Sequence, residues 1–591
     1  MLYSKPNLEN KDDFDLETML KANETTAVSA AERRWVLWFG VLVAFLTSLP
    51  YILGAFVGGS DWVFTGFVFA VEDAYSYLAN MLSGASGNWL FRTPYTTQAQ
   101  SGVLIYLHYL FLGKLTVPAG QHSQLLILYH LFRIFSIFMV CLATYQFIAF
   151  FIPNISLRRW GLALASLGGG AGWLIILFGW QAWLARLPLS DVPGLSMPLT
   201  FYSPETFGFL ALYGLPHVAL ARALLLWGLK YYLELASQEA SETFPWMKGA
   251  LTGIIWLLAL LAQSLTGMVT GAVAGFYLLV LFIWQGMRAQ SGRSTDWKRV
   301  WRALRVTVWV GLFALPLVIY YISSFQYDVV MRSWNFQSPL PSPHPIFFLF
   351  AYGLLIPFAL LGGVQIVRRR PWRGILLVSW VLALPILAYA PFNMQRRLVD
   401  GLWIALIVLA LTSLSPSFSP QDQPATRNKL RYSFYGSSAV GFFATLILII
   451  GGISATLKPA QPLYRRPDQV HAFNQLANLA APGEVVLSSH NTGNPMPAFA
   501  PVRVVIGITT LTVAYDRVAA QVDSIYQANT LDAERQALLK KWDVEYVYWG
   551  PDERELGNWD PHQALYLEKI ISTGEHEIFR VKGGEEKAAG Y

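Results

Sequence analysis

Hydrophobic positions along the chain gather into long apolar runs that are separated by short polar segments. A helix needs about 20 apolar residues to cross roughly 30 Å of hydrocarbon, and about eleven runs have the length and composition of such spans. The pattern therefore predicts a polytopic α-helical membrane domain over residues 35–457. The expected spans cover residues 35–57, 124–151, 160–180, 207–234, 249–265, 267–287, 304–324, 346–367, 374–390, 401–415 and 436–457.

Beyond residue 457 the apolar runs shorten, and helix-like segments alternate with strand-like ones. The strand signals are Glu484-VVLSS, Arg503-VVIG, Val544-EYVYW and His576-EIFRV. Strands that alternate with helices are typical of a small mixed or parallel sheet. The pattern predicts an α/β domain over residues 458–582, followed by a disordered tail at 583–591.

Composition supports the membrane assignment. The 591 residues are 54% hydrophobic and 13% charged, with a mean hydropathy of +0.41, whereas a soluble globular protein carries about 25% charge. The net charge of +7 could suit a nucleic-acid partner, but the basic residues lie in loops between apolar runs, so membrane topology explains them and no nucleic acid is expected. The single cysteine, Cys141, excludes an intrachain disulfide.

The distribution of Lys and Arg predicts the orientation of the spans. If residues 1–34 form a cytoplasmic tail, every inner segment carries Lys or Arg, which is the pattern that the positive-inside rule describes. The outer loops before the last span carry Arg92, Lys114, Arg186, Arg332, Arg396 and Arg397. The sequence therefore predicts a multi-pass protein of the cell membrane whose C-terminal domain is extracytoplasmic.

The first external loop, residues 58–123, is too long for a simple connection and must have structure of its own. It contains Val71-EDAYSYLANMLSGASGN-Trp89, which begins with two adjacent carboxylates, Glu72 and Asp73. If a helix starts near residue 74, Asp73, Tyr77 and Asn80 share one face at i, i+4 and i+7. A purely structural alternative is that Asp73 caps this helix.

Paired arginines precede the tenth span on the outer side, where the charge rule disfavours them. The fork of a guanidinium binds two phosphate oxygens at once, so Arg396 and Arg397 are candidate ligands for a phosphate. The alternative is that both side chains extend to lipid headgroups.

Two further arginines, Arg133 and Arg222, lie inside apolar runs and follow His130 and His217. A charge at this depth normally faces the interior of the bundle and has a partner. Structural pairing across helices and the lining of a lipid-phosphate pocket both remain open for them, and His217 could contact either a substrate hydroxyl or a backbone carbonyl. The candidate acidic partners are Glu205 and Asp191.

A metal requirement is not resolved by the sequence. Glu72, Asp73, Asp191 and Glu205 could supply oxygen ligands to a divalent cation such as Mg or Mn, although no tight metal-ligand spacing occurs. In the C-terminal domain, Ser488-SHNTGNPMP suits either a loop that contacts an acceptor or an ordinary turn.

The stretch Glu72-DAYSYLANMLSGASGNWLF, together with Asn393-MQRRLVDG, resembles a bacterial branch of the GT-C superfamily of integral membrane glycosyltransferases. Similar members include the protein O-mannosyltransferases and the aminoarabinose transferases of lipid A. The resemblance covers most of the membrane part. No WWD-type signature follows the last span, which argues against an oligosaccharyltransferase.

This resemblance implies transfer of a sugar from a polyprenyl-phosphate donor to a glycan, lipid or protein acceptor at the outer membrane face. Asp73 would act as general base with support from Glu72. Arg396, Arg397, Arg222 and His217 would bind the donor phosphate, and Tyr77, Asn80 and Glu205 the acceptor or sugar. Two other classes stay open: a transporter or flippase of a lipid-linked saccharide, and a non-catalytic assembly protein with the same fold.

Overall fold

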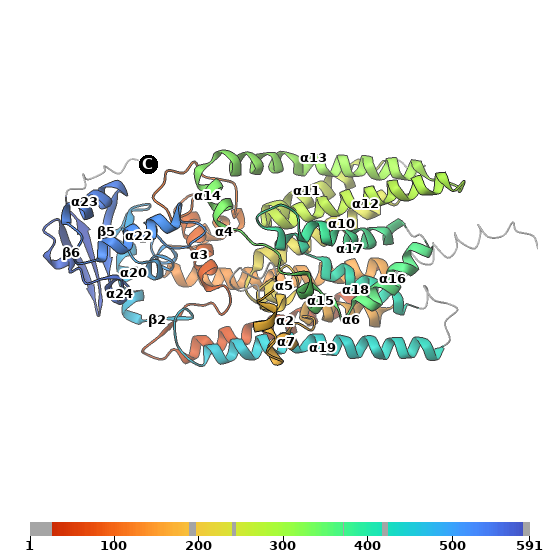
Figure 1. Cartoon of the computed structure of the whole chain (residues 1–591), viewed down its shortest axis with the longest axis horizontal. Helices are drawn as coiled ribbons and strands as arrows, with labels where there is room; N and C mark the ends of the chain where they lie inside the picture. Colours follow the sequence, from red (N-terminus) through yellow and green to blue (C-terminus); the bar gives the residue numbers. More distant parts are fainter. Residues whose placement is uncertain (1–26, 188–196, 239–243, 370–371, 416–423, 583–591) are drawn as a thin grey trace, which may run out of the picture. The chain divides into compact units, whose positions relative to one another are not determined.

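The computed structural model describes residues 27–187, 197–238, 244–369, 372–415 and 424–582 (Figure 1). The chain divides into two compact units. The helical unit comprises Met1–Phe45, Phe135–Leu315 and Pro341–Leu448, and the sheet unit comprises Leu46–Ile134, Pro316–Leu340 and Ile449–Tyr591.

Helices make up all the regular structure of the helical unit among the described residues. Four of the five boundaries between the two units lie within long helices, which are α2 (Ala30–Val57), α5 (Gln121–Phe151), α13 (Trp297–Tyr327) and α19 (Pro424–Thr456). The fifth, between Leu340 and Pro341, lies in the segment that joins α14 (Val329–Gln337) to α15 (Pro345–Tyr352). The other helices of the helical unit are α6 (Ile155–Leu167), α7 (Trp173–Leu177), α8 (Gln181–Leu184), η1 (Leu199–Phe201), α9 (Phe209–Gly214), α10 (Pro216–Ala236), α11 (Trp246–Ala262), α12 (Ser264–Gln290), α15 (Pro345–Tyr352), α16 (Ile356–Arg369), α17 (Trp372–Ala388), η2 (Gln395–Val399) and α18 (Leu402–Leu414).

The multi-pass character of the chain is confirmed. Six helices among the described residues are long and apolar enough to cross a membrane, and a seventh span is possible if α15 and α16, which meet at 83°, count as one. The predicted total of eleven spans stays a prediction, because several expected runs are shorter or broken. Helices α11 and α17 have 17 residues each.

Local chemistry explains two of the breaks. The expected span at 160–180 is interrupted after α6 at three consecutive glycines, and Gly170 has a φ of +67°, a left-handed conformation that favours glycine. The expected span at 207–234 restarts at Pro216, the first residue of α10. Proline has no backbone N–H to donate, so it suits the first turn of a helix and not its interior.

A buried ionic network joins α10 to the segment before α18. Arg222 is 3% exposed and Asp400 is fully buried. The Nε of Arg222 donates to Oδ1 of Asp400 at 2.6 Å, and the hydroxyl of Thr266 donates to Oδ2 at 2.6 Å. The remaining guanidinium nitrogens of Arg222 donate to the carbonyl oxygens of Phe207 and Pro204. The sequence predicts a partner for Arg222 but not that this partner is Asp400.

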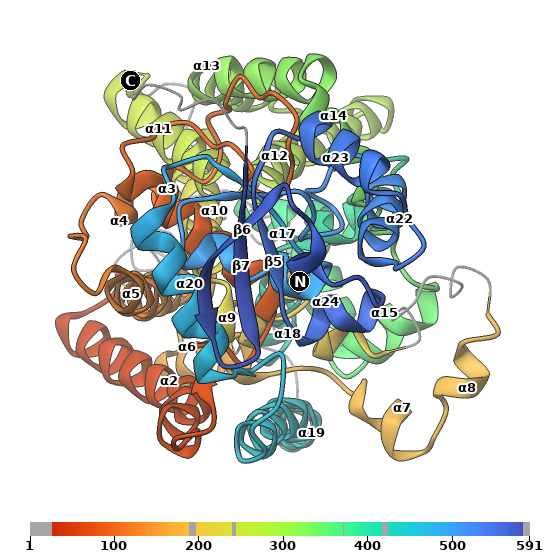
Figure 2. The same cartoon turned by 90° about the vertical axis from the view of Figure 1, so that its left-hand side faces the viewer.

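The sheet unit contains a two-stranded and a five-stranded sheet. The larger sheet has the order β4-β3-β5-β7-β6, in which β4, β3 and β5 are parallel and β7 and β6 are antiparallel to their neighbours. Figure 2 shows β5, β7 and β6 side by side. The strands are β1 (Val63–Phe64), β2 (Tyr464–Arg465), β3 (Val485–Leu487), β4 (Arg503–Val504), β5 (Val544–Trp549), β6 (Leu567–Thr573) and β7 (His576–Val581).

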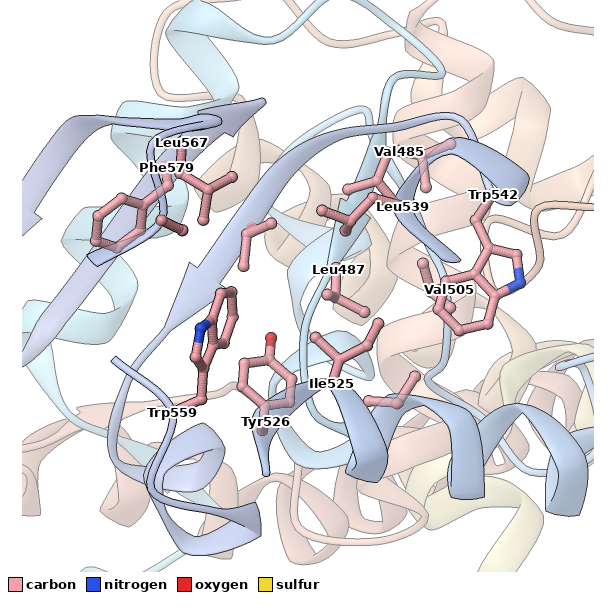
Figure 3. Packing of buried hydrophobic residues seen from close by; sticks show 14 of the residues in the cluster. Val485, Leu487, Val505, Ile525, Tyr526, Leu539, Trp542, Trp559, Leu567 and Phe579 are labelled. Atoms are coloured by element: carbon pink, nitrogen blue, oxygen red, sulfur yellow. The ribbon is translucent and has the colours of Figure 1, made fainter. Parts of the chain in front are cut away.

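Short helices surround these strands. They are α3 (Val71–Ala85), α4 (Leu107–Gly113), α14 (Val329–Gln337), α20 (Pro467–Leu479), α21 (His490–Gly493), η4 (Met496–Ala498), α22 (Tyr515–Tyr526), α23 (Asp532–Lys541), α24 (Pro551–Leu556) and η5 (Pro561–Gln563). Helices α22 and α23 pack on the sheet through Ile525, Tyr526 and Leu539, which meet Leu487 and Val485 in one apolar cluster (Figure 3).

The C-terminal segment does not form a compact unit by itself. Strand β1 in the first loop pairs antiparallel with β2, so that Val63 lies opposite Arg465 and Phe64 opposite Tyr464. Contacts therefore group residues 449–591 with residues 46–134 and 316–340. The strand at each of the four predicted positions is present, and β2 and β6 are additional. A separate domain with a boundary near residue 458 stays a prediction.

Replacement of Asp400 by Asn should strongly destabilise the protein. The change leaves Arg222 buried without a counter-charge, and the loss of one partner of a buried pair costs about 3–5 kcal/mol. Thermal unfolding of the purified protein in detergent measures the effect as a lower midpoint. The matched control is Glu234→Gln, which removes the half-exposed partner of Lys230 on the same helix and should cost no more than about 1 kcal/mol. Equal losses in the two variants would contradict a special role for the buried pair.

Candidate functional site

The two carboxylates singled out in the sequence lie in the first turn of α3. The helix begins at Val71 after Ala70, which has a left-handed backbone (φ 50°) and no side-chain cap. The prediction that Asp73 caps the helix is therefore wrong, because the helix starts three residues earlier than its spacing suggested. Glu72 and Asp73 are exposed.

The loop that carries α21 lies against this end of α3. The side-chain amide of Asn494 donates to the carbonyl oxygen of Glu72 at 3.4 Å. The hydroxyl of Tyr95, from the first loop, donates to the carbonyl oxygen of Asn494 at 3.0 Å. The Ser488-SHNTGNPMP loop, predicted as an acceptor contact or a turn, thus lies beside the acid pair.

His490 and Tyr515 form the next layer of this site. The Nδ1 of His490 lies 3.2 Å from the hydroxyl of Tyr515. Burial lowers the pKa of His490 below its ordinary 6.5, and the nearby Glu72 partly opposes this shift. Burial also raises the pKa of Tyr515. At neutral pH the carboxylate of Glu72 therefore faces an uncharged imidazole and a protonated phenol.

The side chain of Glu553 holds the backbone of the α21 loop through hydrogen bonds. Its side chain is fully buried, and its two oxygens accept from the backbone N–H of Ser489 at 2.8 Å and of Gly550 at 3.0 Å. Burial raises the pKa of Glu553. The hydroxyl of Ser489 in turn accepts from the N–H of Thr492. These bonds hold the loop in one conformation next to α3.

A buried cation also belongs to the sheet unit. Arg465 is 4% exposed. Its Nη1 donates to the carbonyl oxygen of Asn491 at 3.5 Å, and its guanidinium carbon lies 5.8 Å from the ring centre of Tyr75 in α3. The sequence analysis did not single out Arg465. The available signal was a pair of adjacent arginines, Arg465 and Arg466, in a polar segment, and the same signal identified Arg396 and Arg397.

Tyr77 and Asn80 have the predicted helical spacing from Asp73 but not its exposure. They are 6% and 2% exposed. The ring of Tyr77 stacks on that of Tyr109 in α4, with centroids 4.8 Å apart and an angle of 12° between the rings. Tyr77 supports the packing of α3 on α4 and Asn80 is buried, so a contact of either with a sugar is not favoured by this structure.

The predicted phosphate ligands lie in the helical unit. The Nε of Arg397 is 3.4 Å from Oε1 of Glu205, and the guanidinium carbon of Arg396 is 4.7 Å from the ring centre of Tyr202. Both arginines are half-buried. The predicted meeting of Asp73 with this pair joins residues of the two units and stays a prediction.

The arginines Arg222 and Arg133 bind protein oxygens in the interior, and His217 is buried. All three nitrogens of the Arg222 guanidinium bind protein oxygens, which supports its structural alternative over phosphate binding. His217, the second residue of α10, is 3% exposed. Arg133 donates to the hydroxyls of Thr47 at 3.0 Å and Ser48 at 2.7 Å.

The residues that could hold a metal do not assemble into a site within the described ranges. No group of three or more His, Cys, Asp or Glu side chains in that part of the chain could hold a metal ion. Glu72 and Asp73 offer two adjacent carboxylates, Glu205 belongs to the helical unit, and Asp191 lies outside the described residues. A bound divalent cation therefore stays a prediction.

No protein-family model matches the chain, and no curated protein matches its sequence. Among solved structures, the chain is similar to the archaeal oligosaccharyltransferase AglB from Archaeoglobus fulgidus in its apo form. The TM-score is 0.48 at 11% identity, over 88% of this chain and 70% of that one. A second structure of AglB, in complex with an inhibitory peptide and a dolichol-phosphate, has a TM-score of 0.48 at 12% identity, over 88% and 70% of the two chains.

The chain is also similar to the arabinofuranosyltransferase AftD from Mycobacteria. The TM-score is 0.51 at 13% identity, over 95% of this chain and 40% of that one, so the chain spans less than half the length of AftD. Both neighbours are glycosyltransferases of the GT-C superfamily. Likeness at this identity reports on the fold alone: the fold of this chain is similar to that of AftD.

Proposed function

We propose that the chain transfers a sugar from a polyprenyl-phosphate donor to an acceptor hydroxyl at the outer face of the cell membrane. The single observation that carries this proposal is the exposed Glu72–Asp73 pair at the amino end of α3, beside the α21 loop. The GT-C fold supports it, because a membrane fold with an exposed acid beside a polar loop suits chemistry at a membrane surface. The N-terminus is placed in the cytoplasm by the positive-inside rule.

The reaction is a single displacement. The acceptor oxygen bonds to the anomeric carbon of the sugar while the bond from that carbon to the phosphate oxygen breaks, and its electron pair stays on the polyprenyl phosphate. The proton of the acceptor hydroxyl passes to the carboxylate of Asp73, which acts as general base. The configuration at the anomeric carbon is inverted.

Two groups of side chains assist this step in the proposal. Glu72 holds the acceptor hydroxyl in position, and His490, whose pKa is lowered by burial, lies near Glu72. Arg396 and Arg397 hold the donor phosphate, whose negative charge grows as the leaving group departs. Glu205 orients Arg397 through the 3.4 Å contact between their side chains.

Replacement of Asp73 by Asn should lower the rate of sugar transfer by about 100-fold or more, since a positioned general base contributes 10²–10⁴-fold. Purified protein is incubated with polyprenyl-phosphate sugars and acceptor candidates, and transfer or slow donor hydrolysis is measured. Glu72→Gln should have a smaller effect.

Asp61→Asn is the matched control for this variant. Asp61 is another exposed acid of the first loop, and its carboxylate accepts from the adjacent Ser60. It should leave transfer and thermal stability unchanged. Full turnover by Asp73→Asn at unchanged stability would remove Asp73 from the mechanism.

Replacement of Arg396 by Gln should raise the KM for the donor about tenfold or more, because a charge-assisted contact to phosphate is lost. Initial rates at varied donor concentration measure this effect. Arg186→Gln, which changes an exposed arginine of another predicted outer loop, is the control and should leave KM unchanged. An unaltered donor KM in Arg396→Gln would show that this arginine does not bind the donor phosphate.

A further inference from the structure

A hollow of about 610 Å³ with both polar and apolar walls, called here the head cavity, opens in the sheet unit. Its walls come from β1 and β2, from the first turn of α5, from α20 and from the segment after η4. The polar residues in the wall that matter here are Arg465, Gln121, His122, Asn474 and Asn478. These residues come from distant parts of the sequence, so no local sequence motif predicts the cavity.

Arg465 is the charged group of this cavity, and its hydrogen bonds inside the protein are few. Its Nη1 donates to Oε1 of Gln461 at 3.4 Å and to the carbonyl oxygen of Asn491 at 3.5 Å, and its guanidinium interacts with the phenol of Tyr75. Within the described residues, the buried Nε of Arg465 has no hydrogen-bond partner, and no acidic side chain forms an ion pair with it. A buried cation needs a counter-charge, so an anionic ligand group fits this position.

The rest of the wall suits a ligand with several hydroxyl groups. Asn474 and Asn478 are exposed and stand one turn apart on α20, and their amides can both donate and accept. The ring of His122 stacks on Phe499, with centroids 3.8 Å apart and an angle of 13°, which gives the cavity one flat apolar wall.

A second hollow, of about 790 Å³ and called here the chain groove, borders the first. Val63, Phe64 and Leu126 line both. The chain groove lies along α2 and α5, two of the helices that are long and apolar enough to span a membrane. Ile127 and Leu131 in its wall are more than half exposed, as expected of a surface that meets hydrocarbon.

We propose that the head cavity and the chain groove together bind a membrane lipid whose head carries a phosphate and several hydroxyl groups. The phosphate would pair with Arg465, the hydroxyls with Asn474 and Asn478, and the chain would lie in the groove. A soluble anion would use the head cavity alone, so the adjoining groove on membrane helices favours a lipid. The proposal concerns binding and stands whether or not the chain transfers a sugar.

Native mass spectrometry of the full chain released from detergent tests this site. The probes are dioleoyl phosphatidylinositol, dioleoyl phosphatidylcholine, farnesyl phosphate and inositol monophosphate. Phosphatidylinositol should bind about tenfold or more tightly than phosphatidylcholine, and Arg465→Gln, which removes the partner of the phosphate, should weaken phosphatidylinositol binding about tenfold or more. Equal affinities of the two lipids for the wild-type chain would overturn the proposal.

Further variants test each part of the site without touching a buried charge. Asn474→Leu with Asn478→Leu should weaken phosphatidylinositol binding about tenfold at unchanged thermal stability, even if Arg465→Gln fails to fold. Ala55→Trp, which fills the chain groove at an exposed position of α2, should weaken the lipid and not inositol monophosphate. The controls Asn529→Leu and Arg517→Gln change exposed residues outside both hollows and should have no effect.

Three results would contradict the assignment. Undiminished binding in the double asparagine variant would exclude recognition of the hydroxyl groups. Farnesyl phosphate bound as tightly as phosphatidylinositol would do the same. Inositol monophosphate bound as tightly as the lipid, with no effect of Ala55→Trp, would show a site for a soluble anion.

Discussion

The sheet unit depends on the attachment of the first loop to a segment about four hundred residues later in the chain. Strand β1 pairs with β2, and Tyr95 holds the carbonyl oxygen of Asn494. These contacts place the acid pair of α3 against the α21 loop, which Glu553 fixes from the other side. Without this attachment the two carboxylates would be ordinary charges on a long connection. Backbone pairing across the sequence therefore creates the candidate site.

The membrane class and much of the secondary structure follow from hydrophobic periodicity, because a run of apolar residues needs no tertiary context to be recognised. The four predicted strands of the C-terminal segment and the helix that follows Asp73 are present. Breaks within spans were harder to predict. The glycines at 168–170 and Pro216 give a helix a place to stop, but whether it stops depends on what packs around it.

The candidate site could be predicted only in part. The acid pair stands out in sequence because charge is rare in this chain, but exposure distinguishes Asp73 from Tyr77 and Asn80 on the same helix, and exposure is a tertiary property. Asp400 and Arg465 were missed for the same reason. Each is an ordinary residue of a polar segment until the fold buries it, when Asp400 meets Arg222 and Arg465 enters the wall of a cavity.

The pairing of Arg222 with Asp400 also constrains how the protein is assembled in a bilayer. Helix α10 does not meet the length and apolarity criteria for a span, yet its Arg222 is buried. A lone guanidinium is costly in hydrocarbon, and its carboxylate partner is synthesised 178 residues later. The guanidinium of Arg222 therefore acquires its counter-charge only after the segment that contains Asp400 has been synthesised.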